Sequence, residues 1–220
     1  KALKAFITTE GTFQFTRLPF GLCSAARVFQ RMMTEIFKGM RNTIYFQDDI
    51  LVFGATVEEH HAVLRQVLHR LQMAGLTLRK EKCKFLVNEV EYLGHTISEQ
   101  GVKPKQNLLS AIEKAPNPKD KDQLRSFMGL IEYYSKFVRN FADKTELLRK
   151  LLKKGEKFRW DSEQQGCFDC IKAEICKAGI LSPFDTSKET IVTVDASATG
   201  LGAVLAQRHK GGERTVAFAS

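Results

Sequence analysis

The sequence predicts an α+β fold, in which strands and helices are mixed without a repeating order. Residues 4–18, KAFITTEGTFQFTRL, alternate apolar and polar side chains as half-buried strands do. Residues 24–39, SAARVFQRMMTEIFKG, space their apolar side chains at helical intervals. No regular strand–helix–strand unit follows, which favours α+β over a parallel α/β sheet. The 220 residues, 43% of them hydrophobic and 27% charged, suffice for one or two folded domains.

Local turn and cap signals mark the elements of the first half. Thr9-Glu10-Gly11 is a turn signal between two strands. Ser24 is a typical N-cap for the first helix, and Gly39 is a typical stop. Thr56 and Glu59 have the spacing of a capping box and predict the start of a second helix. Short strands are then expected at residues 76–78, 84–87 and 90–97.

The second half changes character after Gly101. Prolines punctuate a mainly helical, lysine- and arginine-rich region, and a further helix is expected over residues 162–178. Trp160 and Phe168 are interpreted as core residues. Two strand-like stretches end the chain and are expected to meet at a Gly211-Gly212 turn.

Two adjacent aspartates interrupt the apolar stretch IYFQDDILVF at residues 44–53. Neighbouring side chains of a strand point to opposite faces, so Asp48 and Asp49 converge only at a hairpin tip. We expect the flanking apolar residues to be buried and to hold that tip rigidly. Two carboxylates repel unless a cation lies between them, and Mg²⁺ prefers a few carboxylates completed by water and phosphate oxygens. The alternative is an ordinary acidic turn, in which aspartate is common.

Charge and cysteine content restrict the class of partner and the compartment. The net charge of +9 favours a polyanionic partner, with nucleic acid ahead of an acidic membrane surface. Five cysteines, an odd number, argue against a disulfide framework and for a reducing compartment. Cys167 and Cys170 lack a second ligand pair, which favours two neighbours on one helix over a zinc site. There is no apolar run of about 18 residues and no signal-peptide pattern.

Several blocks together carry a family resemblance. In order along the chain, they resemble the reverse transcriptases of gypsy-type long-terminal-repeat retrotransposons. The resemblance covers essentially all 220 residues. The blocks are FTRLPFGLCSAARVFQR, YFQDDILVF, GLTLRKEKCKF, EYLGHTIS, LRSFMGLIEYYSKFVRNF, FRWDSEQQGCFDCIKAEI and VDASATGLGAVLAQ.

The resemblance implies the domain organisation and the reaction. It implies an RNA-directed DNA polymerase that acts by a two-metal mechanism with Mg²⁺ (or Mn²⁺). Its expected partners are an RNA/DNA primer–template duplex and a dNTP, with no membrane partner. The implied parts are a partial palm (1–103), a helical thumb-like region (104–155), a connection (156–188) and the start of a ribonuclease H-like domain (189–220).

The resemblance also assigns roles to individual residues. Asp48 and Asp49 match the catalytic, metal-binding carboxylates, and Asp195 matches the first metal ligand of the ribonuclease H-like domain. Lys82, with Lys80 as the alternative, would protonate the leaving pyrophosphate. Each assignment has a structural alternative. The alternatives are solvated side chains for Lys80 and Lys82, a plain loop for residues 19–21, a surface position for Gln30, a structural histidine for His95 and a strand-end aspartate for Asp195. The implied nucleotide pocket comprises Pro19, Phe20, Gly21, Gln30, Phe46 and Gln47, and the implied primer-binding hairpin comprises Leu93, Gly94 and His95.

The chain departs from the family pattern in ways that affect activity. The third catalytic carboxylate of the family would lie upstream of Lys1, and further ribonuclease H ligands would lie after Ser220. We therefore expect these 220 residues alone to be inactive as a polymerase and as a ribonuclease. Ala26, Phe46 and Gln47 also replace the usual proline, tyrosine and aliphatic residue.

Two other functions remain open at this point. One is a non-catalytic nucleic-acid-binding remnant, and the other is a partner chain that dimerises with an intact polymerase. The expected location is the cytoplasm, a retroelement particle or the nucleus, without secretion.

Overall fold

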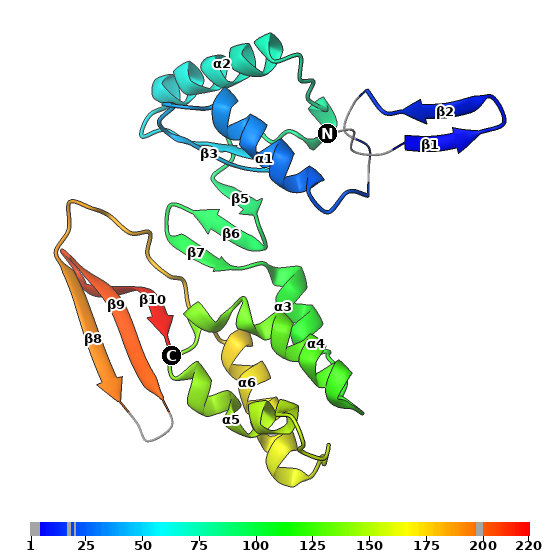
Figure 1. The fold of residues 1–220 in the computed structure, drawn as a ribbon. Helices are drawn as coiled ribbons and strands as arrows, with labels where there is room; N and C mark the ends of the chain where they lie inside the picture. The colour runs from blue at the N-terminus through cyan, green and yellow to red at the C-terminus, as the bar shows by residue number, and fades with distance from the viewer. Residues whose placement is uncertain (1–4, 17–18, 20, 197–199) are drawn as a thin grey trace. The chain divides into compact units, whose positions relative to one another are not determined.

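The computed structural model describes residues 5–16, 19, 21–196 and 200–220 (Figure 1). The contacts divide the chain into two compact units, one up to Leu86 and one from Val87 to Ser220. Each unit contains both helices and antiparallel strands, so the predicted α+β class is confirmed. None of the helices within the described ranges is both long and apolar enough to cross a membrane.

The first unit begins with the predicted hairpin. Strand β1 (Ala5–Thr8) pairs with β2 (Gly11–Gln14), and Thr8 lies opposite Gly11. Thr9-Glu10 therefore forms a two-residue turn, as the alternating pattern predicted. Both strands are exposed along their whole length, and Phe6 stacks on Phe13 with 5.8 Å between the ring centroids.

The core of the first unit lies between two helices and a second hairpin. The helices α1 (Ala25–Ile36) and α2 (Val57–Met73) contact strands β3 (Thr43–Phe46) and β4 (Asp49–Val52), respectively. Four side chains are almost completely buried between these elements, namely Met33, Phe37, Val67 and Leu71. The helical spacing over residues 24–39 predicted the helix that carries Met33.

The predicted caps behave differently at the two helices. Ser24 precedes α1 but makes no side-chain cap hydrogen bond. At α2, the Thr56 Oγ1 accepts from the Glu59 backbone N–H at 3.2 Å, as predicted. The Glu59 carboxylate accepts from Ala55 N at 2.7 Å and from Asn42 Nδ2 at 2.7 Å. Glu59 thus ties the start of α2 to the residue before β3.

Two of the short strands expected after α2 are wrong. Residues 76–78 and 84–87 form no strand, and the only regular element between them is the 3₁₀ turn η1 (Lys80–Lys82), as far as the described residues go. A strand needs a hydrogen-bonding neighbour, and no described strand pairs with these segments. Leu78, Phe85 and Leu86 are consequently about half exposed. The third expected stretch forms β5 and β6 of the second unit.

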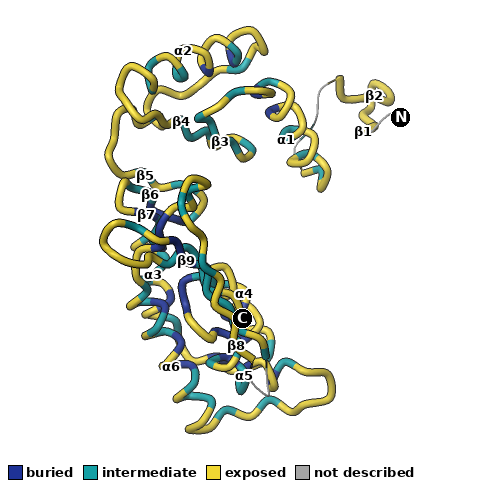
Figure 2. Tube along the Cα trace, turned by 90° about the vertical axis from the view of Figure 1, so that its left-hand side faces the viewer, coloured by how far each residue is buried: buried dark blue, intermediate teal, exposed yellow. Residues whose placement is uncertain are grey.

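The second unit joins a three-stranded sheet to a helical bundle. The sheet is an antiparallel meander of β5 (Glu89–Tyr92), β6 (His95–Ser98) and β7 (Gly101–Pro104). The bundle follows, and its inward-facing residues are buried (Figure 2). Its elements are α3 (Gln106–Glu113), α4 (Lys121–Glu132), η2 (Ser135–Phe137), α5 (Phe141–Leu152) and α6 (Ser162–Cys176).

Helix α6 packs in the same core as the thumb-like helices. Phe168 is completely buried, with ring centroids 4.5 Å from Phe127 and 5.5 Å from Trp160. The interpretation of Phe168 as a core residue is confirmed, whereas Trp160 is half-buried and packs against the same core. The contacts group β5–β7 and α6 with the other helices, whereas the resemblance placed family boundaries after residues 103 and 155. Those boundaries stay predictions.

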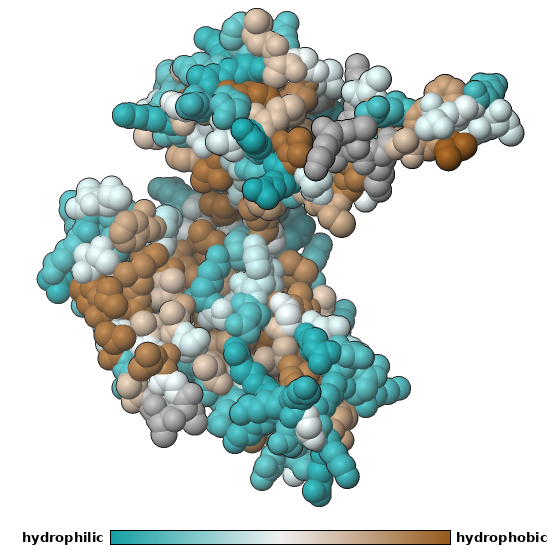
Figure 3. Space-filling model, in the orientation of Figure 1, coloured by the Kyte–Doolittle hydropathy of each residue, from teal (hydrophilic) through white to brown (hydrophobic). Residues whose placement is uncertain are grey.

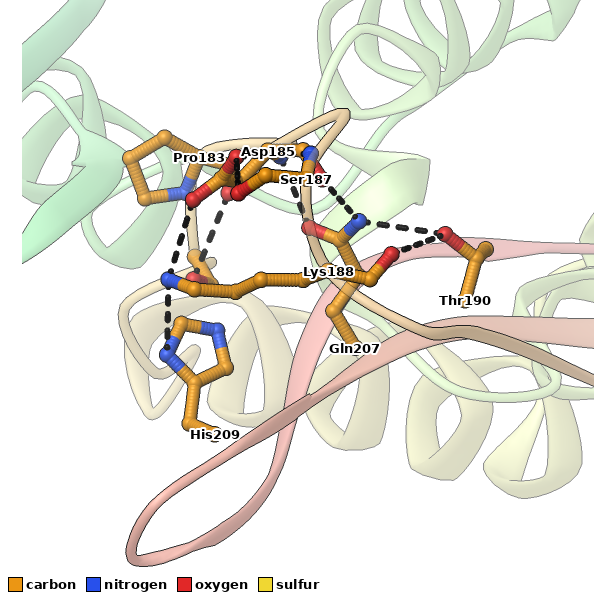
Figure 4. A network of polar contacts seen from close by, with 8 residues as sticks. Pro183, Asp185, Ser187, Lys188, Thr190, Gln207 and His209 are labelled. Atoms are coloured by element: carbon orange, nitrogen blue, oxygen red, sulfur yellow. Dashed lines mark hydrogen bonds and ion pairs between the residues drawn. The ribbon is translucent and has the colours of Figure 1, made fainter.

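A buried glutamine hydrogen-bonds the last sheet to the segment that precedes it. Its strands are β8 (Thr190–Ala196), β9 (Leu201–His209) and β10 (Gly212–Ala219), with β9 in the centre. Gln207 is fully buried, and its amide points toward the segment before β8 (Figure 4). The Gln207 Nε2 donates to Asp185 O at 2.7 Å, and Asp185 N donates to Gln207 Oε1 at 2.8 Å.

One face of this sheet is apolar and exposed. Val192, Val194 and Leu201 are 60%, 71% and 72% exposed, and apolar side chains gather over β8 and β9 in Figure 3. Phe218 of β10 instead packs against the helical core. The sheet is therefore covered on one side by the bundle of its own unit.

A backbone pairing connects the segment after α6 to strand β7. Val102 N donates to Leu181 O at 2.8 Å, and Leu181 N donates to Val102 O at 2.9 Å. Gly101, next to this pairing, has φ +139°, and a Cβ there would lie 2.2 Å from Leu181 O. Only glycine meets both demands.

Replacing Gly101 by alanine should therefore destabilise the second unit. We expect Gly101→Ala to lower the free energy of unfolding by more than about 1 kcal/mol, because the new methyl group collides with the Leu181 carbonyl. The matched control is Gly129→Ala, on the exposed face of α4 with no atom within 4 Å of the new Cβ. It should stabilise by about 0.5–1 kcal/mol, and urea unfolding measures both. Equal midpoints for the two variants would contradict this account.

Candidate active site

The paired aspartates lie at the tip of the β3–β4 hairpin. Phe46 pairs with Asp49, which leaves Gln47 and Asp48 as the two turn residues. Both aspartates are exposed. The predicted hairpin tip is confirmed, and its reversal brings the two acidic residues to the same end of the strands.

The two faces of this hairpin differ in burial. Tyr45, Ile50 and Val52 pack against the core of the first unit. The expectation that all flanking apolar residues are buried is wrong for the opposite face, because the described chain covers one side of this two-stranded sheet. Asp49 shares the open face with its cross-strand partner Phe46. Three flanking side chains remain 45–48% exposed, namely Ile44, Phe46 and Phe53.

The carboxylates of Asp48 and Asp49 are available to a cation. Across the described residues, no lysine, arginine or histidine lies within 4.0 Å of either carboxylate. Nor does that part of the chain bring three histidine, cysteine or acidic side chains together as a complete metal cage. Mg²⁺ takes one or two protein carboxylates together with water and substrate phosphates, so this open pair fits it.

A side chain from α1 fixes the turn that carries Asp48. Gln47 has φ +51°, a left-handed conformation that non-glycine residues rarely adopt. Its backbone N–H donates to the Gln30 Oε1 at 2.6 Å. Sequence reasoning placed both glutamines in the nucleotide pocket but missed this bond, because a positive φ at a non-glycine turn residue leaves no local sequence signal.

The Pro19-Phe20-Gly21 segment is described only in part. Phe20 lies outside the described residues. Pro19 is half-buried, and Gly21 is exposed with φ +79° and has no atom of the described residues within 4 Å of the position a Cβ would take. Gly21 is therefore required for its backbone conformation and leaves open space in front of it.

The candidate lysines lie in the 3₁₀ turn η1. Lys82 N donates to Arg79 O at 3.0 Å, which closes the turn. The ammonium groups of Lys80 and Lys82 are exposed and form no ion pair with any described residue. No described contact brings either lysine to the aspartates, so the assignment of Lys82 stays a prediction.

The candidate primer-binding residues form the β5–β6 turn of the second unit. Leu93 and Gly94 occupy its two central positions, with φ +45° and +73°, and Tyr92 pairs with His95. Leu93 is 37% exposed, whereas His95 is 8% exposed. The tip can contact a ligand, while the imidazole lies beneath it.

The surroundings of His95 favour its neutral form. Burial first, and the charge of Lys136 second, lower the pKa of His95 to about 4. The Lys136 Nζ lies 3.0 Å from the His95 Nε2, and the pKa of Lys136 is also lowered by burial. The ring stacks on Tyr133 at 5.0 Å between centroids. The role of His95 toward a primer phosphate stays a prediction, because the ring is covered here.

Asp195 lies at the open end of the last sheet. It pairs with Gly202 across β8 and β9 and is exposed. Together with Asn140, Asp143 and Ser220 it lines a small hollow near the start of α5. Its assignment as a metal ligand stays a prediction, since the described residues complete no metal site around it.

Removing the Gln30 acceptor should loosen the turn that carries Asp48. In Gln30→Ala, the Gln47 N–H loses its partner, and its amide exchange with solvent should accelerate by about fivefold, the value of one hydrogen bond. Gln30→Glu keeps an acceptor oxygen and serves as the matched control. NMR-detected hydrogen exchange gives both rates, and an unchanged Gln47 rate in Gln30→Ala would show that the turn is fixed by something else.

Titration of His95 should make stability depend on pH. The folded pKa of about 4 lies below the ordinary 6.5, so the unfolded chain binds the extra proton between these values. The contribution to stability is thus complete above pH 6.5 and is lost as the pH falls toward 4. In Lys136→Met the His95 pKa should rise toward its ordinary value, as followed by imidazole NMR. A wild-type His95 that titrates near its ordinary pKa would contradict the buried arrangement.

Two family models match separate parts of this chain. Residues 1–97 match the family model "Reverse transcriptase (RNA-dependent DNA polymerase)". Residues 160–220 match the model "RNase H-like domain found in reverse transcriptase". The family is that of RNA-directed DNA polymerases, which generally use divalent metal ions.

Curated relatives are retrotransposon polyproteins. The chain is 37% identical over 220 residues to the Pol polyprotein from transposon 412 of Drosophila melanogaster, covering 99% of this chain and 18% of that protein. It is 31% identical over 207 residues to the Tf2-3 polyprotein of Schizosaccharomyces pombe, covering 93% of this chain and 16% of that protein. The chain thus spans less than a fifth of either relative.

Solved structures agree with these relatives. The foamy viral protease-reverse transcriptase in complex with double-stranded DNA superposes with a TM-score of 0.85 at 27% identity, covering 98% of this chain and 38% of that one. The same viral protein with an RNA/DNA hybrid gives 0.82 at 27% identity, covering 98% and 29%. The chain belongs to the reverse transcriptase family of retrotransposon Pol polyproteins, with an RNase H-like part at its C-terminal end.

Proposed function

We propose that this chain is the part of an RNA-directed DNA polymerase that presents two catalytic carboxylates and supports the primer end of the duplex. The substrates would be a primer–template and a dNTP. The observation that carries the proposal is the β3–β4 tip, where Asp48 and Asp49 are exposed and unpaired by any described cation. Because the chain belongs to the reverse transcriptase family, we take these two carboxylates to be the metal-binding pair.

Within this proposal Asp48 and Asp49 hold Mg²⁺ or Mn²⁺. The bound ions would neutralise charge on the nucleotide phosphates during nucleotidyl transfer. Gln30 holds the turn in the required shape, and Phe46 lies beside Asp49 on the open face. Asp195 would take a metal in the RNase H-like part, and Lys82 would donate a proton to pyrophosphate.

Nucleic acid is the proposed partner because the chain is positively charged and its structural relatives were solved with nucleic acid. A net charge of +9 favours a polyanion, and lysine or arginine contacts to phosphates need no sequence recognition. The foamy viral relatives were solved with double-stranded DNA and with an RNA/DNA hybrid. Exposed Leu93 and Gly94 would contact the primer. The cytoplasm, a retroelement particle or the nucleus is the proposed location.

Catalysis by these 220 residues alone is not part of the proposal. Two carboxylates without the third should bind metal weakly, and a displacement of about 1 Å can cost a hundredfold in rate. Binding without catalysis is the second candidate, favoured by the net charge of +9. A dimer with an intact polymerase chain is a further form that this candidate could take.

Binding of a primer–template should be strong at low salt and weak at high salt. We expect affinity to fall by at least about tenfold between roughly 50 and 200 mM salt, because several phosphate contacts release counterions. Fluorescence anisotropy with a labelled duplex measures this. Asp48→Asn should bind at least as well as wild type, since it removes a negative charge. No binding at the lower salt concentration would refute nucleic acid as the partner.

The catalytic role is testable in a graft. Residues 1–220 would replace the matching segment of the transposon 412 polyprotein, and primer extension with Mg²⁺ would be measured. Asp48→Asn should reduce the rate by about a hundredfold or more, the usual loss of a transition-state electrostatic contact. Glu58→Gln, on the exposed first turn of α2, is the matched control and should retain the graft's rate. Full activity of the Asp48→Asn graft would remove the aspartate pair from the mechanism.

A further inference from the structure

We propose that Tyr133 and Tyr134 are positioning residues for the Leu93-Gly94 turn. Their hydroxyl groups fix the turn to the helical bundle, so that the primer-side tip and the helices move as one body. The inference rests on the proposed function, because it takes this turn to be the support of the primer end.

Each hydroxyl binds one carbonyl of the turn. The Tyr133 hydroxyl donates to Leu93 O at 2.5 Å, and the Tyr134 hydroxyl donates to Gly94 O at 3.1 Å. Lys105 N also donates to Gly94 O at 3.1 Å, which a carbonyl with two lone pairs can accept. Both turn carbonyls are thus held by groups outside the hairpin.

The turn needs such support because its own residues disfavour it. Positive φ at both central positions is the geometry of a type I′ turn, for which Asn-Gly is the preferred pair. Leu93 has a branched side chain and no polar group to stabilise a left-handed backbone, which costs about 1 kcal/mol or more. The conformation therefore depends on contacts from the bundle.

The tyrosine rings form a block with the start of β6. His95 lies parallel to Tyr133, with 6° between the ring planes, and edge-on to Tyr134 at 5.9 Å. A Cβ on Gly94 would lie 3.3 Å from both the Tyr133 ring and the Tyr134 hydroxyl. The close approach explains why glycine follows Leu93.

This block has a mechanical consequence. The contacts place the turn in the unit that begins at Val87, together with the helices. Any movement of the helical bundle is then transmitted to the tip that would hold the primer. The alternative is that the two tyrosines only pack against their neighbours. In that case their rings stabilise the fold, and their hydroxyl groups do not affect the conformation of the turn.

Tyrosine-to-phenylalanine changes separate these readings, because they keep the ring and remove the hydroxyl. The variants are Tyr133→Phe, Tyr134→Phe and the double variant. Tyr45→Phe is the matched control, since the Tyr45 hydroxyl makes no hydrogen bond among the described residues and the residue packs against the core of the first unit. Tyr133 is 50% exposed, so its change should leave the fold intact even where the buried Tyr134 contributes to stability.

Two measurements on the 220-residue chain test the proposal. Amide exchange of His95 reports how firmly the turn is closed, and it should accelerate by about tenfold or more in the double variant. A primer with a photoreactive 3′-terminal thiothymidine reports placement, and its cross-link to residues 93–95 should fall severalfold while duplex affinity stays within about twofold. Tyr45→Phe should leave both readouts at the wild-type value.

The outcomes distinguish the proposal from the function on which it rests. Unchanged exchange or unchanged cross-linking in the double variant, with duplex binding intact, overturns the positioning role and leaves the proposed function standing. A wild-type chain that binds no duplex overturns both. Faster exchange together with a lost cross-link supports the role of the two hydroxyls.

Discussion

Both proposed functional tips depend on one constraint, a non-glycine residue held in the left-handed backbone region by a side chain from a distant part of the chain. Gln47 is held through its N–H by Gln30, which lies 17 residues earlier. Leu93 is held through its carbonyl by Tyr133, which lies 40 residues later. Because neither turn is favoured by its own residues, the shape of each tip is a property of tertiary packing.

The β3–β4 hairpin, the proposed catalytic element, is packed on one face and open on the other. Its covered face contributes Tyr45, Ile50 and Val52 to the core of the first unit, which anchors the strands. The other face leaves Phe46 and Asp49 accessible to a nucleotide or metal. Such one-sided burial is the arrangement that a surface acting on a large polymer requires, since a deeply enclosed site would exclude the duplex.

The sequence predicted the features that are encoded locally. Alternation predicted the β1–β2 hairpin, helical spacing predicted α1, the capping box predicted the start of α2, and the aspartate pair predicted the β3–β4 tip. The strands expected at residues 76–78 and 84–87 failed because apolar character alone does not supply a neighbouring strand.

The parts that escaped prediction depend on contacts between distant residues. The left-handed turn residues Gln47 and Leu93 carry no glycine or asparagine signal. The burial of His95 follows from Tyr133 and Lys136, roughly forty positions later. Blocks of family resemblance suggested the candidate site residues, but spacing along a chain does not reveal which side chain fixes which turn.

The pairing of Val102 with Leu181 has a consequence for biosynthesis. Helix α6, whose Phe168, Ile171 and Ile175 are fully buried, is needed to fill the bundle core, and the chain then returns to β7. A ribosome that has released only residues up to about 160 would hold a bundle with an open apolar groove. The second unit therefore completes its core only after these late-emerging residues are available, and until then the exposed apolar surface favours aggregation.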